Sequence, residues 1–192
     1  DRYCREKPIE WSVSVWDLDS VEFIMQYDTP FIKIPSAMLT NDNLLEAVKE
    51  TKNSIILSTG MSSIGEIDRA VDILRTRHLT LLHCNSTYPA PEEDLNLNNI
   101  KMLADRYGLP VGYSGHEQDL EASMVAVVLG ATIVERHITL DHNMWGTDQS
   151  SSLEIIAMDM LKKRCNTIHT MLGCYDRIVT ESEKSIRKKL RG

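Results

Sequence analysis

The chain has 192 residues, which is enough for one well-buried domain and short for two. Its composition, 42% hydrophobic and 26% charged, is typical of a soluble globular protein, and no apolar run reaches the ~20 residues of a membrane span. The net charge of −7 argues against a nucleic-acid-binding protein, which would carry a basic face. Four scattered cysteines without a signal peptide predict reduced thiols in a cytoplasmic protein.

Six short runs rich in apolar and β-branched residues recur along the chain. Each run is long enough for a buried strand and too short for a helix. The six predicted strands are Trp11–Asp17, Phe31–Ser36, Ser54–Gly60, Leu79–Ser86, Pro110–His116 and Thr132–Thr139.

Amphipathic stretches separate these runs. Apolar residues at helical spacing predict a helix over residues 64–74 and another over 120–128, the second with Asp119 as N-cap and Gly130 as C-cap. The stretch Leu153–Leu172 predicts one long helix, and Glu181–Arg191 predicts a solvated linker or a further helix. Strands alternating with helices every ~20–30 residues indicate βαβ units, so we expect an α/β fold with a parallel sheet.

Polar residues collect at the C-terminal ends of the predicted strands, which form the active face of parallel α/β folds. Lys33 and Ser36 end the second strand, Ser58 the third, and Ser114 and His116 the fifth. Lys33 with these hydroxyls and nearby glycine amides could hold a phosphate group. Each residue alone also fits a structural role in a turn or a cap, but such roles explain poorly why these residues coincide at consecutive strand ends.

The sixth predicted strand carries Glu135 and His137. Strand residues two apart point to the same side, so these two side chains share a face. Two histidines from neighbouring strands, His116 and His137, with a carboxylate beside one of them, suit a catalytic divalent metal that keeps positions open for substrate. The residues alone therefore favour a metal-and-phosphate site.

Five linked segments give a more specific indication. They read Lys-Ile-Pro-Ser-Ala from Lys33, Ile-Leu-Ser-Thr-Gly-Met from Ile56, Leu-Leu-His-Cys-Asn-Ser-Thr-Tyr-Pro-Ala-Pro from Leu81, Val-Gly-Tyr-Ser-Gly-His from Val111 and Glu-Arg-His-Ile-Thr-Leu-Asp from Glu135. In their order and spacing they resemble the motifs of the sialic acid synthase (N-acetylneuraminate synthase) family. The resemblance runs from about Cys4 to Arg191.

The resemblance implies a (β/α)8 TIM-type barrel followed by an antifreeze-like domain, in a homodimer. It implies a transferase of sialic acid biosynthesis, which condenses phosphoenolpyruvate with N-acetylmannosamine or a similar sugar aldehyde to give a nonulosonic acid and phosphate. It also implies a divalent metal cofactor, Mn²⁺ in the first place, with Mg²⁺ or Co²⁺ as alternatives.

The resemblance also implies roles for single residues. His116 and His137 match two metal ligands with catalytic roles, and Glu135 matches a catalytic acidic residue near the reacting carbons. The positions that match phosphoenolpyruvate contacts are Ser14, Lys33, Ser36, Ser58 and Ser114, with Asn85 or Ser86 as a further one. Tyr88 and Asp148 match residues at the sugar.

Six βα units can be counted where a complete barrel has eight. The resemblance implies that the first two strands and the antifreeze-like domain are missing, so we expect residues 1–180 to form a partial barrel domain and 181–192 a linker towards a further domain. We expect the isolated fragment to be inactive. The alternatives are another metal-dependent barrel lyase or aldolase acting on a sugar acid, and a barrel fragment without catalytic activity.

Overall fold

The computed structural model describes residues 1–76 and 78–191. Within these residues, five strands form one parallel sheet in the order β1-β2-β3-β4-β5. The strands are β1 (Ile32–Ile34), β2 (Ile55–Ser58), β3 (Leu79–Cys84), β4 (Val111–Gly115) and β5 (Val134–Arg136). Neighbouring strands are consecutive in the chain, so each connection crosses over through a helical segment, as the βαβ pattern predicts.

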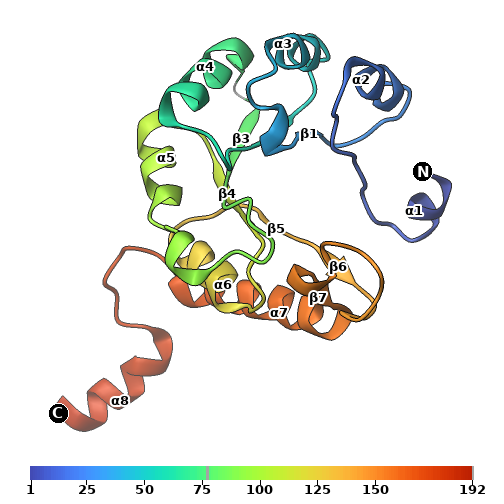
Figure 1. Ribbon diagram of the computed structural model, residues 1–192. Coiled ribbons are helices and arrows are strands. Elements are labelled where there is room, and N and C mark those ends of the chain that lie inside the picture. The colour runs from blue at the N-terminus through green and yellow to red at the C-terminus, as the bar shows by residue number, and fades with distance from the viewer. Residues whose placement is uncertain (77, 192) are drawn as a thin grey trace.

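Helices follow an arc around the outer side of this sheet, as Figure 1 shows. They are α2 (Leu18–Ile24), α3 (Asp42–Glu50), α4 (Ile64–Leu74), α5 (Asn99–Tyr107), α6 (Glu121–Val128) and α7 (Ile155–Leu172). The sheet and helices curl into a half-barrel. Its core lies between the strands and the inner faces of these helices, with Ile34, Leu57 and Leu81 fully buried.

Local sequence explains where these helices begin. Ser63 and Glu66 form a reciprocal capping box at the start of α4, and Asn41 accepts a hydrogen bond from Leu44 N at the start of α3. The buried side of α4 then carries Ile67, Ala70 and Leu74. The prediction of a helix over 64–74 is therefore confirmed.

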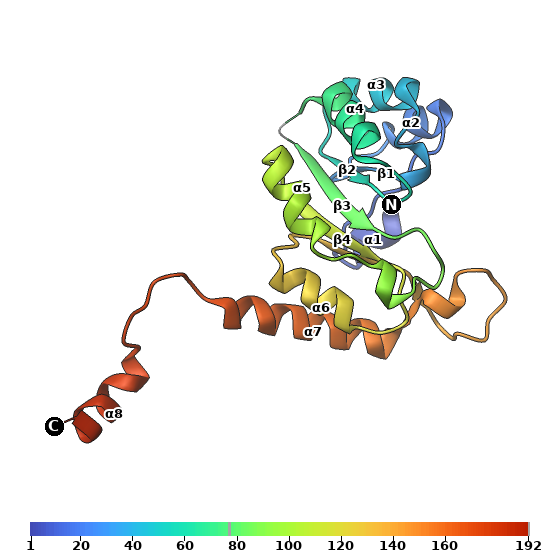
Figure 2. The same ribbon diagram turned by 60° about the vertical axis from the view of Figure 1, so that its left-hand side comes forward.

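Both ends of the chain carry short helices. Helix α1 (Arg2–Glu6) precedes the barrel part, and α8 (Glu181–Arg191) has no buried residue. Figure 2 shows α8 standing apart from the other elements at the end of an extended segment. No helix in the described part of the chain combines the length and the apolar character needed to cross a membrane.

The first predicted strand, Trp11–Asp17, is wrong in extent. Only Ser14 forms a bridge, parallel to Lys33, with Val15 N donating to Lys33 O at 3.0 Å. The chain leaves this pairing because Asp17 already caps α2, its Oδ1 accepting from Ser20 N at 2.7 Å. The described residues thus form a five-stranded half-barrel, consistent with part of a TIM-type barrel, rather than six complete units.

The last predicted strand also differs. Thr132–Thr139 divides at His137, whose carbonyl accepts a hydrogen bond from Leu153 N at 2.8 Å. The residues after the break form β6 (Ile138–Thr139), which pairs with β7 (Leu153–Glu154) in a separate small sheet. Leu153 and Glu154 therefore belong to a strand, and the long predicted helix begins at Ile155.

The predicted caps of α6 are each displaced by one residue. Its N-cap is Leu120 rather than Asp119, without a side-chain cap, and its C-cap is Leu129 rather than Gly130. Gly130 follows with φ 99°, a conformation that favours glycine.

Candidate functional site

The C-terminal ends of the strands surround a cavity of about 750 Å³. It brings together eleven of the twelve predicted site residues: Ser14, Lys33, Ser36, Ser58, Ser86, Tyr88, Ser114, His116, Glu135, His137 and Asp148. They come from the strands of the main sheet or the segments directly after them, from the segment paired at Ser14 and, for Asp148, from the loop between β6 and β7. Carboxyl ends of parallel strands meet at one edge, so residues more than 100 positions apart share this cavity.

One wall of the cavity is built to receive an anion. The side chain of Lys33 is only 8% exposed, and its Nζ lies 3.3 Å from Glu135 Oε1. Ser114 Oγ donates to the same carboxylate oxygen at 2.8 Å. A buried ammonium group and a hydroxyl thus converge on one negative oxygen, as they would on a phosphate or carboxylate ligand.

Ser58 adds an unsatisfied group to this wall. The residue is 3% exposed, and its Oγ has no hydrogen-bond partner among the described residues. A buried hydroxyl without a partner costs free energy, so it is expected to bind a ligand or water in the working protein.

A tight corner lies beside Ser58, where Gly60 N donates to Ser36 Oγ at 3.0 Å. Ser36 Oγ also lies 3.2 Å from Cys84 Sγ. A Cβ at position 60 would overlap Ser86 Oγ and lie 2.9 Å from Cys84 Sγ, so only glycine leaves room for these groups. Sequence reasoning missed Cys84 as part of the cavity, because a cysteine inside a strand reads as an ordinary buried residue.

The two predicted metal ligands lie side by side. The ring centroids of His116 and His137 are 5.4 Å apart, and the Tyr88 ring is 4.2 Å from that of His116. His137 Nδ1 lies 3.9 Å from Asp148 Oδ2. Burial raises the pKa of Tyr88, and the nearby carboxylates of Asp148 and Glu135 act in the same direction, so its phenol keeps the proton it can donate.

The tautomer of His116 suits metal binding. Its Nδ1 lies 2.5 Å from the carbonyl oxygen of Asn85, and a carbonyl only accepts, so Nδ1 carries the proton and Nε2 offers a lone pair. Burial lowers the pKa of His116, which favours the neutral, ligating form. Residues 1–76 and 78–191 contain no group of three or more His, Cys, Asp or Glu side chains arranged to hold a metal. The pair fits a metal with two protein ligands and further positions for water or substrate.

Asn85 departs from its predicted role. Its side-chain Nδ2 donates to Asp94 O at 3.3 Å and its Oδ1 accepts from Thr87 N at 2.8 Å, so the amide faces away from the cavity. Of the two alternatives for the further phosphate contact, only Ser86 lines the cavity. Asn85 contributes its backbone carbonyl, which orients His116.

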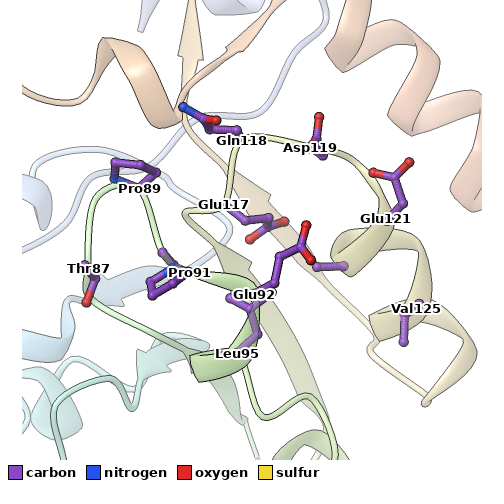
Figure 3. Close-up of a pocket in the computed structure, with 12 residues that line it drawn as sticks. Thr87, Pro89, Pro91, Glu92, Leu95, Glu117, Gln118, Asp119, Glu121 and Val125 are labelled. Carbon is purple, nitrogen blue, oxygen red and sulfur yellow. The ribbon is translucent and has the colours of Figure 1, made fainter.

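Behind the site, Glu117 and Arg136 form an ion pair whose side chains are 5% and 1% exposed. Glu117 follows β4, in a loop that also borders a second hollow next to Pro91 and Glu92 (Figure 3). Sequence reasoning missed Glu117, because a glutamate just after a strand reads as a solvated loop residue.

The sequence pattern of the NeuB family matches residues 1–177. The chain is 38% identical to the N,N'-diacetyllegionaminic acid synthase of Campylobacter jejuni, over 91% of this chain and 55% of the relative. It is 33% identical to the N-acetylneuraminate-9-phosphate synthase of Homo sapiens, over 98% of this chain and 54% of the relative. The chain thus spans about half the length of the curated relatives it matches.

The fold agrees with this relationship. The crystal structure of the N-acetylneuraminic acid (sialic acid) synthetase of Leptospira borgpetersenii, in complex with citrate, matches 99% of this chain and 68% of that chain with a TM-score of 0.90 and 32% identity. The family pattern covers most of the chain, and relatives named as synthases of sialic-type acids align along nearly all of it. This chain belongs to the NeuB family.

Proposed function

We propose that this chain contributes the catalytic face of a carbon–carbon bond-forming transferase, which condenses phosphoenolpyruvate with an N-acetylmannosamine-like open-chain sugar aldehyde. The products are a nonulosonic acid and inorganic phosphate. Support comes from relatives named as synthases of legionaminic and neuraminic acids and from a cavity that combines an anion-binding wall with a histidine pair.

The observation that carries this proposal is that Ser58, whose hydroxyl has no hydrogen-bond partner among the described residues, lines the same cavity as the buried ammonium group of Lys33. Phosphoenolpyruvate carries two anionic groups, a phosphate and a carboxylate. Lys33 and the cavity hydroxyls offer charge-assisted hydrogen bonds to both of them inside a protein of net charge −7. The hydroxyls are those of Ser14, Ser36, Ser58, Ser86 and Ser114.

Glu135 links ligand binding to proton transfer. Its carboxylate is held by Lys33 and Ser114, the groups that the incoming anion also needs. When the ligand takes over these two donors, Glu135 is released as a base beside the reacting carbons. It then accepts a proton from the water that adds at C2 of the substrate.

The bond changes follow from the substrates. C3 of phosphoenolpyruvate forms a bond to the aldehyde carbon, the carbonyl π bond breaks, and the aldehyde oxygen takes a proton. Water adds at C2, and the tetrahedral intermediate collapses to the C2 ketone with cleavage of its C–O bond to phosphate. In the overall balance, the two protons of the water replace those taken up by the aldehyde oxygen and by the departing phosphate. Tyr88 and Asp148, on the histidine side of the cavity, hydrogen-bond the sugar hydroxyls.

A divalent metal, Mn²⁺ in the first place and Mg²⁺ or Co²⁺ as alternatives, would be held by His116 and His137 and would supply Lewis acidity to the aldehyde oxygen. The contribution of the chain is to keep His116 neutral, through burial, and to orient its ring through Asn85 O.

The proposal also covers the domain organisation and the assembly of the protein. Residues 1–180 act as a partial barrel domain and 181–192 as a linker, of which Gly192 lies outside the described residues. The complete enzyme is a cytoplasmic homodimer in which further segments complete the barrel. These 192 residues alone are inactive.

The test has two parts. The chain itself should bind phosphoenolpyruvate in a calorimetric titration, and binding should weaken in Lys33→Met. A protein extended to the length of the relatives should release inorganic phosphate only when phosphoenolpyruvate and an aldehyde hexosamine are both present. Cleavage of a sugar acid without phosphoenolpyruvate would show a lyase or aldolase instead.

A further inference from the structure

The two histidines of the cavity have charged sequence neighbours on the opposite side of the sheet. Glu117 follows His116, and Arg136 precedes His137. Adjacent strand residues point to opposite faces, so Arg136 faces helix α6 while Glu135 and His137 face the cavity. At the C-terminal end of each of these two strands, the residue next to the histidine is therefore one member of the ion pair.

The ion pair takes part in several hydrogen bonds, although Arg136 Nε has no partner among the described residues. Arg136 Nη1 donates to Glu117 Oε1 at 2.8 Å, to Asp119 O at 2.8 Å and to Ser123 Oγ at 3.1 Å, and Arg136 Nη2 donates to Glu117 O. The second carboxylate oxygen of Glu117 accepts from Tyr113 OH at 2.8 Å. These bonds join β5, the middle of β4, the loop after β4 and the start of α6.

Gly115 makes room for this arrangement. A Cβ built at position 115 would lie 2.7 Å from Glu117 Oε2 and 2.9 Å from Arg136 Cδ. Glycine between Ser114 and His116 thus lets the Glu117 carboxylate approach the strand from behind while His116 enters the cavity in front.

A buried ion pair of this kind restricts the relative positions of the segments it joins more than it adds to the free energy of unfolding. Removing two charges from water costs about as much as their attraction returns, whereas losing one partner leaves an uncompensated buried charge. Its lowest-energy state is therefore a narrow set of positions for β5 and the loop after β4.

We propose that the Glu117–Arg136 ion pair is a positioning pair, which fixes the separation and orientation of the His116 and His137 rings and thereby the affinity of the cavity for a divalent metal. The metal part of this inference rests on the proposed function. The part that concerns the geometry of the two rings is independent of the proposed function.

The chain offers a control of the same chemistry, although a more exposed one, in the Asp68–Arg106 ion pair between α4 and α5. Arg106 donates to both Asp68 oxygens, at 2.8 and 2.6 Å, and Tyr107 OH donates to Oδ1 at 2.8 Å. The same chemistry, an arginine, a carboxylate and a tyrosine, thus occurs away from the histidines.

The experiment compares Glu117→Gln and Arg136→Met with Asp68→Asn in the protein without and with Mn²⁺. Calorimetry measures the Mn²⁺ dissociation constant, and thermal denaturation verifies that each variant is folded. Imidazole ¹⁵N–¹H spectra without metal report the tautomer of each ring, and ring–ring Overhauser effects report the approach of His116 to His137.

We expect Glu117→Gln and Arg136→Met to weaken Mn²⁺ binding by roughly 10–100-fold, the range typical of groups that orient metal ligands. They should also lose the single His116 tautomer and the ring–ring effect, while Asp68→Asn keeps both. If either variant fails to fold, Ser123→Ala, which removes one hydrogen bond to Arg136 and one to Glu117 and leaves the charges paired, should show a smaller change in the same direction.

The inference is overturned if the folded variants melt earlier but keep the wild-type dissociation constant and imidazole spectrum, because the pair would then serve stability alone. A wild-type protein that binds no Mn²⁺ overturns the metal part together with the proposed function. The metal-free spectra then still decide whether the pair positions the rings.

Discussion

Lys33 Nζ and Glu135 Oε1 lie 3.3 Å apart, although β1 and β5 stand at opposite ends of the sheet order. In a flat sheet, four interstrand steps would separate these strands by ~19 Å, beyond the combined reach of the two side chains. The contact therefore requires the curl of the half-barrel. The pairing of the Lys33 ammonium group with the Glu135 carboxylate is thus a consequence of sheet curvature.

Lys33 is expected to dominate the affinity for the anionic substrate. Lys33→Met removes a charge-assisted contact of ~1.5–3 kcal/mol, so the dissociation constant for phosphoenolpyruvate should rise roughly 10–100-fold. Calorimetric titration measures this, with the more exposed Lys49, paired to Glu46 on α3, replaced by Met as the control. In an active extended protein, a large effect on the sugar constant with an unchanged phosphoenolpyruvate constant would reverse the placement of the substrates.

The histidine pair is expected to carry the metal dependence. His116→Ala and His137→Ala should each abolish measurable Mn²⁺ binding, because one remaining imidazole is too weak a site. His142→Ala, an exposed histidine near Glu154, should bind Mn²⁺ like the wild type. Near-normal binding by either cavity variant, followed by electron paramagnetic resonance, would remove the metal assignment.

Replacement of Ser58 is expected to weaken ligand binding without lowering stability. Its Oγ is buried without a partner among the described residues, so Ser58→Ala should leave the free energy of unfolding unchanged or raise it by about 1 kcal/mol. The same change should weaken phosphoenolpyruvate binding. Chemical denaturation and titration measure the two effects. A clear loss of stability would mean that the hydroxyl is already bonded in the free protein.

Gly60 is expected to be irreplaceable for binding. In Gly60→Ala the new methyl group would displace Ser86 and crowd Ser36 and Cys84, so phosphoenolpyruvate affinity should fall by tenfold or more, on the order of the loss of one charged hydrogen bond. Gly65→Ala is the control, since no heavy atom lies within 4 Å of a Cβ there. That change in α4 should leave affinity intact and stabilise the protein by about 0.5–1 kcal/mol. Equal affinities for the two variants would contradict the prediction.

The free energy of unfolding is expected to depend on pH through His83. Burial lowers its pKa from the ordinary 6.5, against the opposing effect of its hydrogen bond to Leu95 O. Below about pH 6.5, His83 therefore binds a proton in the unfolded chain but stays neutral in the folded protein. The free energy of unfolding should fall as the pH falls through this value. Above this value, His83 should not affect the free energy of unfolding. Urea denaturation from ~pH 8 to ~pH 5 measures the slope. His83→Gln should reduce the slope and leave the part that comes from the buried His116, whereas replacement of the exposed His78 should leave the slope unchanged.

The sequence by itself determined the class of fold and predicted most of the residues that line the candidate site. Alternating short apolar runs and amphipathic stretches predict parallel βαβ units, because strand and helix periods are local properties. The same locality places Lys33, Ser58, Ser114 and His116 at strand ends and puts Glu135 and His137 on one face. The family resemblance then assigned Ser14, Tyr88 and Asp148, and the structure places all three in the same cavity.

The tertiary structure decided what depends on packing between distant segments. Curvature brings Lys33 to Glu135, the direction of the loop after β3 turns Asn85 away, and α2 begins too early for Trp11–Asp17 to pair beyond Ser14. The burial of Glu117 against Arg136 depends on the room left by Gly115 and on the position of α6. No periodic pattern in the sequence predicts these relationships, because each depends on residues that come into contact only when the strands and helices pack together.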